Sequence, residues 1–319
     1  MLRTIPLDGA LLSFDRDTGM GVLADGPETS HLVQLAPRVV QFGITNACNL
    51  ACGFCSRDVH ARSTWTIDSA FALLADLADA GTLEVAFGGG EPLTFKGFPT
   101  LVERLHRETP LAVSFTTNGT RLDDAMLDAL EDHVAQIRVS IYDEEDWRSV
   151  IARLASRGVC FGVNVLVSPA RLPKLEATVL ELVSLGCRDV LFLGYHGRDA
   201  SMHLTPAQDA LLARSVRVLA RACPGVRLAL DVCFGDRMST LPSAHLGLPR
   251  TDCGAGRDFV VVTSDGHVSP CSFHDVGFPI ASARDVLAVF ARERSRLGAS
   301  IDDPGCMRAP RDRVRLEVL

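Results

Sequence analysis

The stretch Cys48-Asn-Leu-Ala-Cys52-Gly-Phe-Cys55 follows a run of β-branched and apolar residues that begins at Val39. The run predicts a buried strand, so the cysteines lie in the loop at its carboxyl end, where α/β folds place their chemistry. Three thiols in one short loop can converge on a single metal centre. The stretch therefore predicts a metal-binding loop at the edge of an α/β sheet.

Two other interpretations of this loop stay open from the residues alone. A structural zinc site would use the three cysteines with His60 as a fourth ligand. A disulfide is less favoured, because three cysteines leave one unpaired.

The chain after the first strand alternates short apolar runs with segments of helical periodicity, which predicts an α/β fold. Parallel neighbours need crossover connections, so the pattern favours a partial (β/α)6 barrel, with an open doubly wound sheet as the alternative. The six candidate strands begin near Val39, Leu83, Leu111, Gln136, Val159 and Asp189.

Three regions are expected along the chain. Residues 39–224 form the partial barrel, and residues 225–319 form a small α+β module with a β-hairpin that turns at Asp265-Gly266. Residues 1–38 form an N-terminal hairpin extension, indicated by turn signals at Asp8-Gly9 and Asp17-Thr18-Gly19.

Composition narrows the function classes. The 319 residues are 47% hydrophobic, which excludes disorder, and a formal charge of −7 argues against nucleic acid as a partner. Neither a secretory signal nor an apolar run of membrane-spanning length is found, so we expect a cytoplasmic protein with no membrane contact. Ten cysteines in that reducing setting predict metal binding, catalysis or burial rather than disulfides.

The cysteine spacing resembles that of the radical S-adenosylmethionine (SAM) enzymes, which also place an aromatic residue just before the last cysteine, as Phe54 is here. The second predicted strand ends in Gly88-Gly89-Gly90-Glu91, which resembles the Gly-Gly-Glu element of that family. Asn118 and Ser140, at the ends of the third and fourth strands, match positions that commonly lie beside SAM.

The resemblance implies a specific chemistry. Cys48, Cys52 and Cys55 would hold a [4Fe-4S] cluster with one open iron, which binds SAM and cleaves it to a 5'-deoxyadenosyl radical. The radical removes a hydrogen atom from the substrate, and a flavodoxin- or ferredoxin-type donor supplies the electron. Glu91 belongs to this catalytic set and, with Gly89 and Gly90, would bind the SAM amino group; the implied cofactor-binding residues are Phe54, Gly89, Gly90, Glu91, Asn118 and Ser140.

A second cysteine group lies in the C-terminal region. Cys253, followed by Gly266 and Cys271, resembles the opening element of the SPASM and shorter twitch extensions, which hold auxiliary iron-sulfur clusters. The cysteine count excludes a second auxiliary cluster. We expect one, [4Fe-4S] in type, with Cys306 as a third ligand and Cys233 as the candidate for the fourth. The other cysteines, expected to be buried, are Cys160, Cys187 and Cys223.

Substrate residues are expected after the sixth strand, at Tyr195, His196 and Arg198, although a solvated loop is the competing interpretation. The auxiliary cluster favours an oxidative outcome, a cross-link or a dehydrogenation. A ribosomally made precursor peptide is the favoured substrate, although residues 1–38 are too short for the winged-helix leader-peptide domain of many peptide maturases. The alternatives are oxidation of a small-molecule alcohol such as an aminocyclitol, and a non-catalytic iron-sulfur or zinc scaffold.

Overall fold

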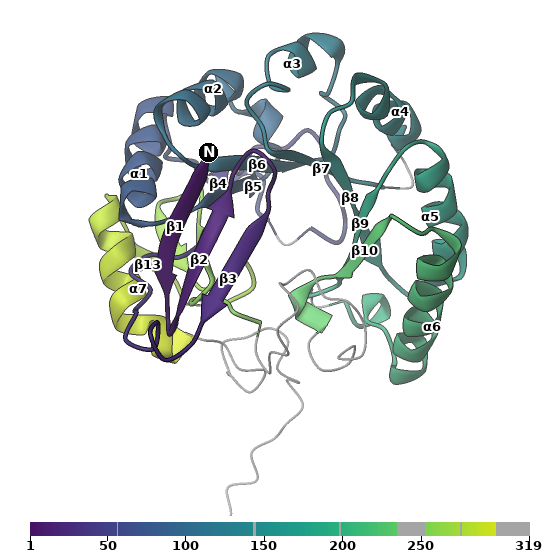
Figure 1. Ribbon diagram of the computed structural model, residues 1–319. Helices are drawn as coiled ribbons and strands as arrows, with labels where there is room; N and C mark the ends of the chain where they lie inside the picture. The colour runs from purple at the N-terminus through teal and green to yellow at the C-terminus, as the bar shows by residue number, and fades with distance from the viewer. Residues whose placement is uncertain (56, 143–144, 198, 235–252, 275, 298–319) are drawn as a thin grey trace, which may run out of the picture.

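The computed structural model describes residues 1–55, 57–142, 145–197, 199–234, 253–274 and 276–297 (Figure 1). Arg198 and Cys306, two of the predicted site residues, lie outside these ranges. Within them, no helix combines the length and the apolar character needed to cross a membrane.

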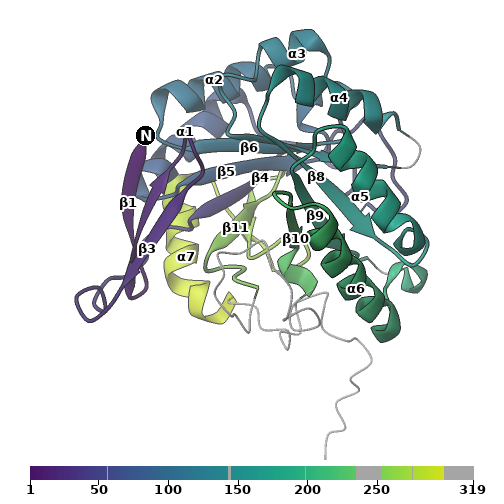
Figure 2. The ribbon, with the colours of Figure 1, turned by 45° about the vertical axis from the view of Figure 1, so that its right-hand side comes forward.

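A ten-stranded sheet forms the body of the molecule, in the order β10-β9-β8-β7-β6-β5-β4-β11-β12-β13. The pairs from β4 to β10 are all parallel, and the sheet curves into an open wall rather than a closed barrel (Figures 1 and 2). In the order of the chain, this sheet begins with β4 (Val39–Thr45), β5 (Glu84–Gly89), β6 (Ala112–Thr117), β7 (Gln136–Ser140), β8 (Phe161–Val167), β9 (Asp189–Gly194) and β10 (Arg227–Leu230). The six strands predicted from the sequence are confirmed, as is the partial barrel.

Helices cover the outer side of this wall, which argues against the doubly wound alternative (Figure 1). They are α1 (Ile67–Ala80), α2 (Phe98–Glu108), α3 (Asp124–Asp128), α4 (Trp147–Arg157), α5 (Leu175–Ser184) and α6 (Pro206–Ala222). Capping chemistry sets where several of them begin. Thr66 and Ser69 form a capping box at α1, and Thr205 and Gln208 form another at α6, where Pro206 occupies the first turn.

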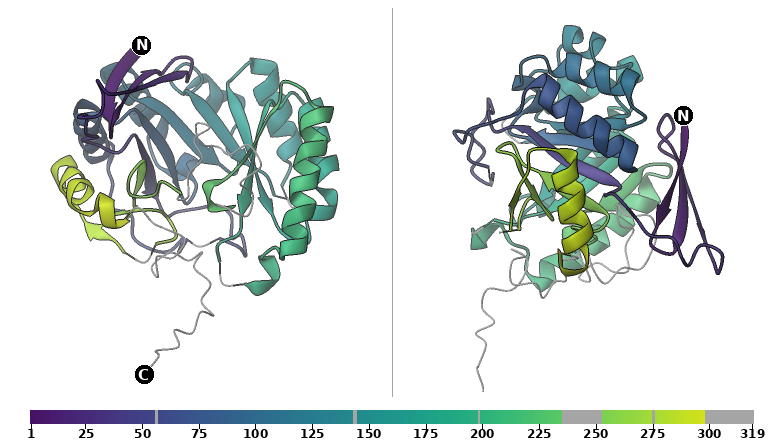
Figure 3. Two further views of the ribbon diagram at one scale, coloured as in Figure 1. Left: turned by 60° about the horizontal axis from the view of Figure 1, so that its bottom comes forward. Right: turned by 90° about the vertical axis from the view of Figure 1, so that its left-hand side faces the viewer.

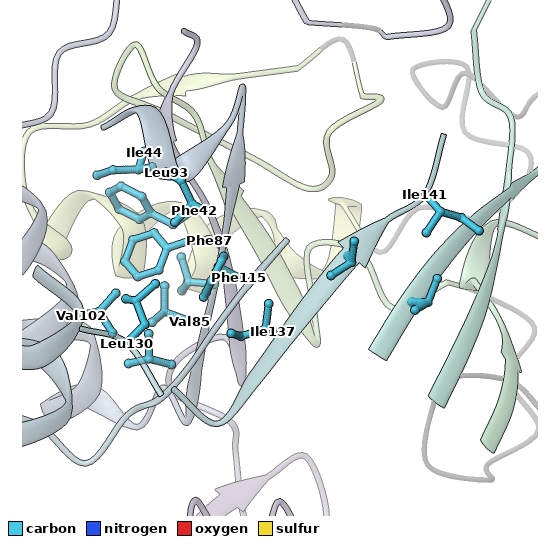
Figure 4. Packing of buried hydrophobic residues seen from close by; sticks show 14 of the residues in the cluster. Phe42, Ile44, Val85, Phe87, Leu93, Val102, Phe115, Leu130, Ile137 and Ile141 are labelled. Atoms are coloured by element: carbon cyan, nitrogen blue, oxygen red, sulfur yellow. The ribbon is translucent and has the colours of Figure 1, made fainter. Parts of the chain in front are cut away.

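The core fills the space between the sheet and its helices (Figure 4). Phe42, Phe87, Phe98 and Phe115 make a run of edge contacts, with ring centroids 5.3 to 5.6 Å apart. Because side chains alternate along a strand, the residues next to these point to the inner side of the wall. The inner side is where polar strand residues gather.

Residues 225–297 contribute to both ends of the same sheet. Strand β10 pairs with β9, whereas β11 (Phe259–Val262) pairs in parallel with β4 at the other end. The predicted hairpin is present: β12 (His267–Ser269) runs antiparallel to β11 and also pairs with β13 (Phe278–Pro279). Helix α7 (Ala283–Leu297) lies beside α1 (Figure 3). The domain boundary at residue 224 stays a prediction.

The N-terminal extension has three strands where a hairpin was expected, because both turn signals are used: β1 (Leu2–Leu7), β2 (Ala10–Asp15) and β3 (Gly21–Asp25) form an antiparallel sheet. Arg3 donates to the carbonyl oxygens of Ala78 and Thr82, and Arg16 donates to those of His106 and Thr109. The two cations thus satisfy carbonyl groups at the carboxyl ends of α1 and α2.

Candidate active site

The cysteine loop is anchored to the Gly-Gly-Glu element by backbone hydrogen bonds. The Gly90 N–H donates to the Thr45 carbonyl oxygen over 2.6 Å, and the Glu91 N–H donates to that of Ala47 over 2.9 Å. A Cβ atom on Gly90 would lie 2.1 Å from the Ala47 oxygen. Glycine is therefore required here for packing, because a side chain would push away the segment that leads into Cys48.

All three predicted cluster ligands line one cavity of about 350 Å³. The Leu50 N–H donates to the Cys48 sulfur, and the Arg57 N–H donates to the Cys55 sulfur. Cys48, Cys52 and Cys55 are not joined in disulfides. Three thiols that line one cavity, two of them beside backbone N–H donors, suit a [4Fe-4S] cluster that keeps one open iron, so the residues fit the group that the sequence resemblance implies.

The residues predicted to bind SAM line the same cavity: Phe54, Gly89, Gly90, Glu91, Asn118 and Ser140. They come from the cysteine loop and from the carboxyl ends of β5, β6 and β7, which are neighbours in the sheet. The structure thus brings together residues that are up to 86 positions apart in the sequence. Their individual roles toward SAM stay predictions.

Glu91 is buried, and the chain itself engages its carboxylate. Oε1 accepts from the Leu93 N–H and the Thr117 hydroxyl, while Oε2 accepts from the Asn118 N–H over 2.8 Å. Burial raises the pKa of Glu91, and these three hydrogen bonds oppose that shift. The carboxylate therefore joins the end of β5 to the end of β6 and fixes the shape of this cavity wall.

A second cavity of about 350 Å³ adjoins the first and shares part of its wall, including Phe54, Cys55 and Tyr142. The Phe54 and Tyr142 rings lie 5.4 Å apart. The predicted substrate residues Tyr195 and His196 line this second cavity. We call the two cavities together the chamber.

Arg138, which sequence reasoning missed, lies on the inner side of the barrel wall below the chamber. Its guanidinium donates to Asp189 and to Asn164, and Asn164 lines the second cavity. Burial lowers the pKa of Arg138 and the nearby aspartate opposes that shift. A Cβ atom on Gly162 would lie 2.8 Å from this guanidinium, so the glycine makes room for it. The sequence does carry a signal for this residue, because Arg138 is a charged residue two positions before Ser140, on the same strand face.

Arg57 is a second residue that the sequence did not single out. It lines both cavities and donates to the Ser272 hydroxyl over 3.2 Å. Burial lowers its pKa, whereas the neighbouring Cys55 acts to raise it. Arg57 thus links the cysteine loop to the segment after Cys271.

The second cysteine group divides in two. Cys253 and Cys271 both pack against the small cluster of Ala255 and Phe259. Cys233 instead follows β10, and its sulfur gathers with His196 and Asp231. Of the cysteines expected to be structural, Cys187 and Cys223 are buried as predicted, but Cys160 is exposed, because it precedes β8 at the open amino edge of the sheet.

Comparison with known proteins agrees with this geometry. The family model for the radical SAM superfamily matches residues 42–160. The PqqA peptide cyclases of Gluconobacter oxydans (strain 621H) and Xanthomonas axonopodis pv. citri (strain 306) are 29% and 28% identical to this chain; each alignment covers 74% of the chain, and 71% and 68% of the relatives.

The fold is shared with Streptococcus suis SuiB, solved with S-adenosylmethionine and with precursor peptide SuiA. The TM-score is 0.71 for both, at 12% and 11% identity; the matches cover 91% and 90% of this chain, and 86% and 88% of the SuiB chains. The family match, the relatives and the cysteine-lined cavity lead to one conclusion: the chain belongs to the radical SAM superfamily and is a radical SAM enzyme.

Proposed function

We propose that this enzyme carries out an oxidative modification of a ribosomally made peptide, a cross-link or a dehydrogenation, by radical SAM chemistry. One observation carries the proposal: the three-cysteine cavity shares part of its wall with a second cavity that is lined by Tyr195, His196 and Phe273. A substrate held in the second cavity lies next to the place where SAM is cleaved.

The peptide substrate is supported by the relatives. The curated relatives are named PqqA peptide cyclases, and SuiB has been solved with its precursor peptide. The second cavity is bounded by separate loops, after β7, β9, β10 and β12, which suits an extended ligand.

The roles of the chain's own residues follow from their positions. When bound, the [4Fe-4S] cluster supplies the electron that cleaves SAM. Cys48, Cys52 and Cys55 hold that cluster, and Gly89 and Gly90, which pack against the backbone that leads into Cys48, form part of the SAM site. Glu91 holds the ends of β5 and β6 in position and contacts the SAM amino group. Phe54, Asn118 and Ser140 complete the SAM site.

The oxidative outcome depends on an electron acceptor for the substrate radical. We propose an auxiliary [4Fe-4S] cluster of the SPASM or twitch type, held by Cys253, Cys271 and Cys306, near the loop that Arg57 contacts. A flavodoxin- or ferredoxin-type donor in the cytoplasm reduces the first cluster. Product formation then depends on both cysteine groups.

Anaerobic reconstitution tests the proposal. The iron-loaded enzyme, given dithionite and SAM, is expected to form 5'-deoxyadenosine, and Cys52→Ala is expected to abolish this. Cys160→Ala is the matched control, because this exposed thiol lies outside both cavities. With a precursor peptide encoded beside the gene, the product is expected to lose two hydrogen atoms. A reconstituted wild-type enzyme that forms no 5'-deoxyadenosine would refute the enzymatic proposal, and 5'-deoxyadenosine formed without any peptide change would refute the substrate class.

A further inference from the structure

Three different metal-binding side chains meet at the wall of the chamber, and the proposed reaction uses none of them as a set. The imidazole of His196, the carboxylate of Asp231 and the thiol of Cys233 each place one ligand atom within 4.8 Å of the others. His196 is buried, and the other two are partly buried. We propose that they form a mononuclear zinc site, whose metal content can be measured separately from the reaction proposed above.

The sheet topology explains why these residues meet. Strands β9 and β10 are parallel neighbours, with Leu230 paired to Phe192, so their carboxyl ends lie side by side. His196 comes just after β9, and Asp231 and Cys233 come just after β10. The Asp231 N–H donates to the Phe192 carbonyl oxygen and continues the pairing to the edge of the site.

The Asp231 carboxylate is held in a fixed orientation. The Gly194 N–H donates to Oδ2 over 2.9 Å, and the Cys233 N–H donates to Oδ1 over 2.8 Å. These bonds orient the group, and a carboxylate oxygen, which has two lone pairs, can bind a cation while it accepts one N–H. Such hydrogen bonds to a ligating carboxylate are typical of metal sites.

The His196 ring is also positioned. It packs against the Phe273 ring with centroids 4.8 Å apart, and a Cβ atom on Gly194 would lie 3.5 Å from Nε2. Gly194 is also the residue that donates to Asp231. The imidazole nitrogen and the carboxylate therefore both lie next to Gly194.

The chemistry of the three ligands and the distances between them favour a single metal ion over an iron-sulfur cluster. Zinc–sulfur bonds of about 2.3 Å and zinc–nitrogen bonds of about 2.1 Å place two ligands of one tetrahedral ion about 3.5 Å apart. Ligands within 4.8 Å reach that spacing by small side-chain rotations, whereas ligands to separate irons of a cluster stand further apart. One thiolate, one imidazole and one carboxylate suit Zn²⁺.

Three protein ligands leave one position of a tetrahedral zinc ion open. His196 and Asp231 line the second cavity, so this position faces the substrate side of the chamber. There the ion would accept a lone pair from an oxygen, nitrogen or sulfur atom of the substrate. Cys233 then belongs to this site rather than to the fourth auxiliary-cluster position expected from the sequence.

Metal analysis of the full-length, iron-loaded protein tests the assignment. The protein is reconstituted anaerobically with iron and sulfide, equilibrated with Zn²⁺ and dialysed, and its zinc, iron and sulfide are then measured. We expect one zinc per chain, with an X-ray absorption signature of a single sulfur neighbour among nitrogen and oxygen. His196→Phe, which keeps a ring against Phe273, and Cys233→Ser are each expected to weaken zinc binding at least about tenfold.

Two control variants keep the result interpretable. His203→Phe changes an exposed histidine outside the site, and should retain zinc. Cys253→Ser should lower iron and sulfide but retain zinc. The proposal is overturned if wild-type protein keeps no zinc, if the zinc has only sulfur neighbours, or if Cys233→Ser lowers iron and sulfide as Cys253→Ser does. Circular dichroism and iron at the three-cysteine loop show that each variant has folded.

Discussion

Replacing Gly90 by alanine is expected to destabilise the protein at the base of the cysteine loop. The new Cβ atom would lie 2.1 Å from the Ala47 carbonyl oxygen and 2.5 Å from that of Asn46. Both contacts are with backbone, so rotation of a side chain cannot relieve them. The segment before Cys48 must move.

The size of the effect follows from these distances. Contacts of Cβ atoms below 3.0 Å are essentially never found, so the Ala47 oxygen must move by about 0.9 Å. A movement of that size along the hydrogen bond from the Glu91 N–H, now 2.9 Å long, lengthens it beyond bonding distance. Overpacking costs about 1 to 3 kcal/mol, and the lost hydrogen bond adds about 1 kcal/mol. The total is about 3 kcal/mol.

Urea denaturation measures this loss. For a slope of about 3 kcal/mol per molar urea, the unfolding midpoint of Gly90→Ala should fall by about 1 M. Gly88→Ala is the matched control from the same strand, because a Cβ atom there meets nothing within 4 Å. Its midpoint should not fall. Iron bound at the three-cysteine loop should also decrease in Gly90→Ala. Equal midpoints for the two variants would refute the packing argument.

Three further changes test other contacts. Burial raises the pKa of Glu91 above its ordinary value of 4.5, so the free energy of unfolding of the wild type, relative to that of Glu91→Gln, should decrease as the pH rises above that value. Urea unfolding of both proteins at about pH 5 to 8 measures this, and a relative stability of the wild type that grows with pH would contradict it. The Trp65 indole N–H donates to the Thr263 carbonyl oxygen over 2.8 Å, so Trp65→Phe should lower the free energy of unfolding by about 1 kcal/mol, and an unchanged urea midpoint would argue against a stabilising contact. Arg57 lies beside Cys55, so Arg57→Met removes a positive charge and should lower the reduction potential of the cluster held there by roughly tens of millivolts. A redox titration followed by electron paramagnetic resonance measures the potential, and a raised value would contradict this prediction.

Much of the barrel could be predicted because its signals are local. Each strand from β4 to β9 is a short apolar run next to a helical segment, and the cysteine loop carries its motif within eight residues. The resemblance to the radical SAM enzymes implies that Cys48 and Glu91 serve one site, and the carboxyl edge of the sheet is where α/β folds place such a loop. The structure brings them to the same cavity wall.

The C-terminal part could not be predicted in the same way. The run Phe259–Val262 predicts a strand, but nothing in it identifies β4 as its partner, since any exposed sheet edge offers the same hydrogen bonds. The surroundings of Cys233 depend on the pairing of β9 with β10, which brings His196 beside it. Sequence spacing relates cysteines to one another and carries no information about a histidine 37 positions earlier.

The pairing of β11 with β4 joins a late segment of the chain to an early one, which affects the order in which the protein folds. The Thr64 hydroxyl donates to the Ser264 carbonyl oxygen, 200 residues later in the chain, and β11 covers an edge of β4 that is exposed until then. During synthesis, the barrel strands and the cysteine loop emerge from the ribosome well before the segment that pairs with β4. The pairing of β11 with β4 joins residues more than 200 positions apart, and we expect it to be the slow, late step of folding.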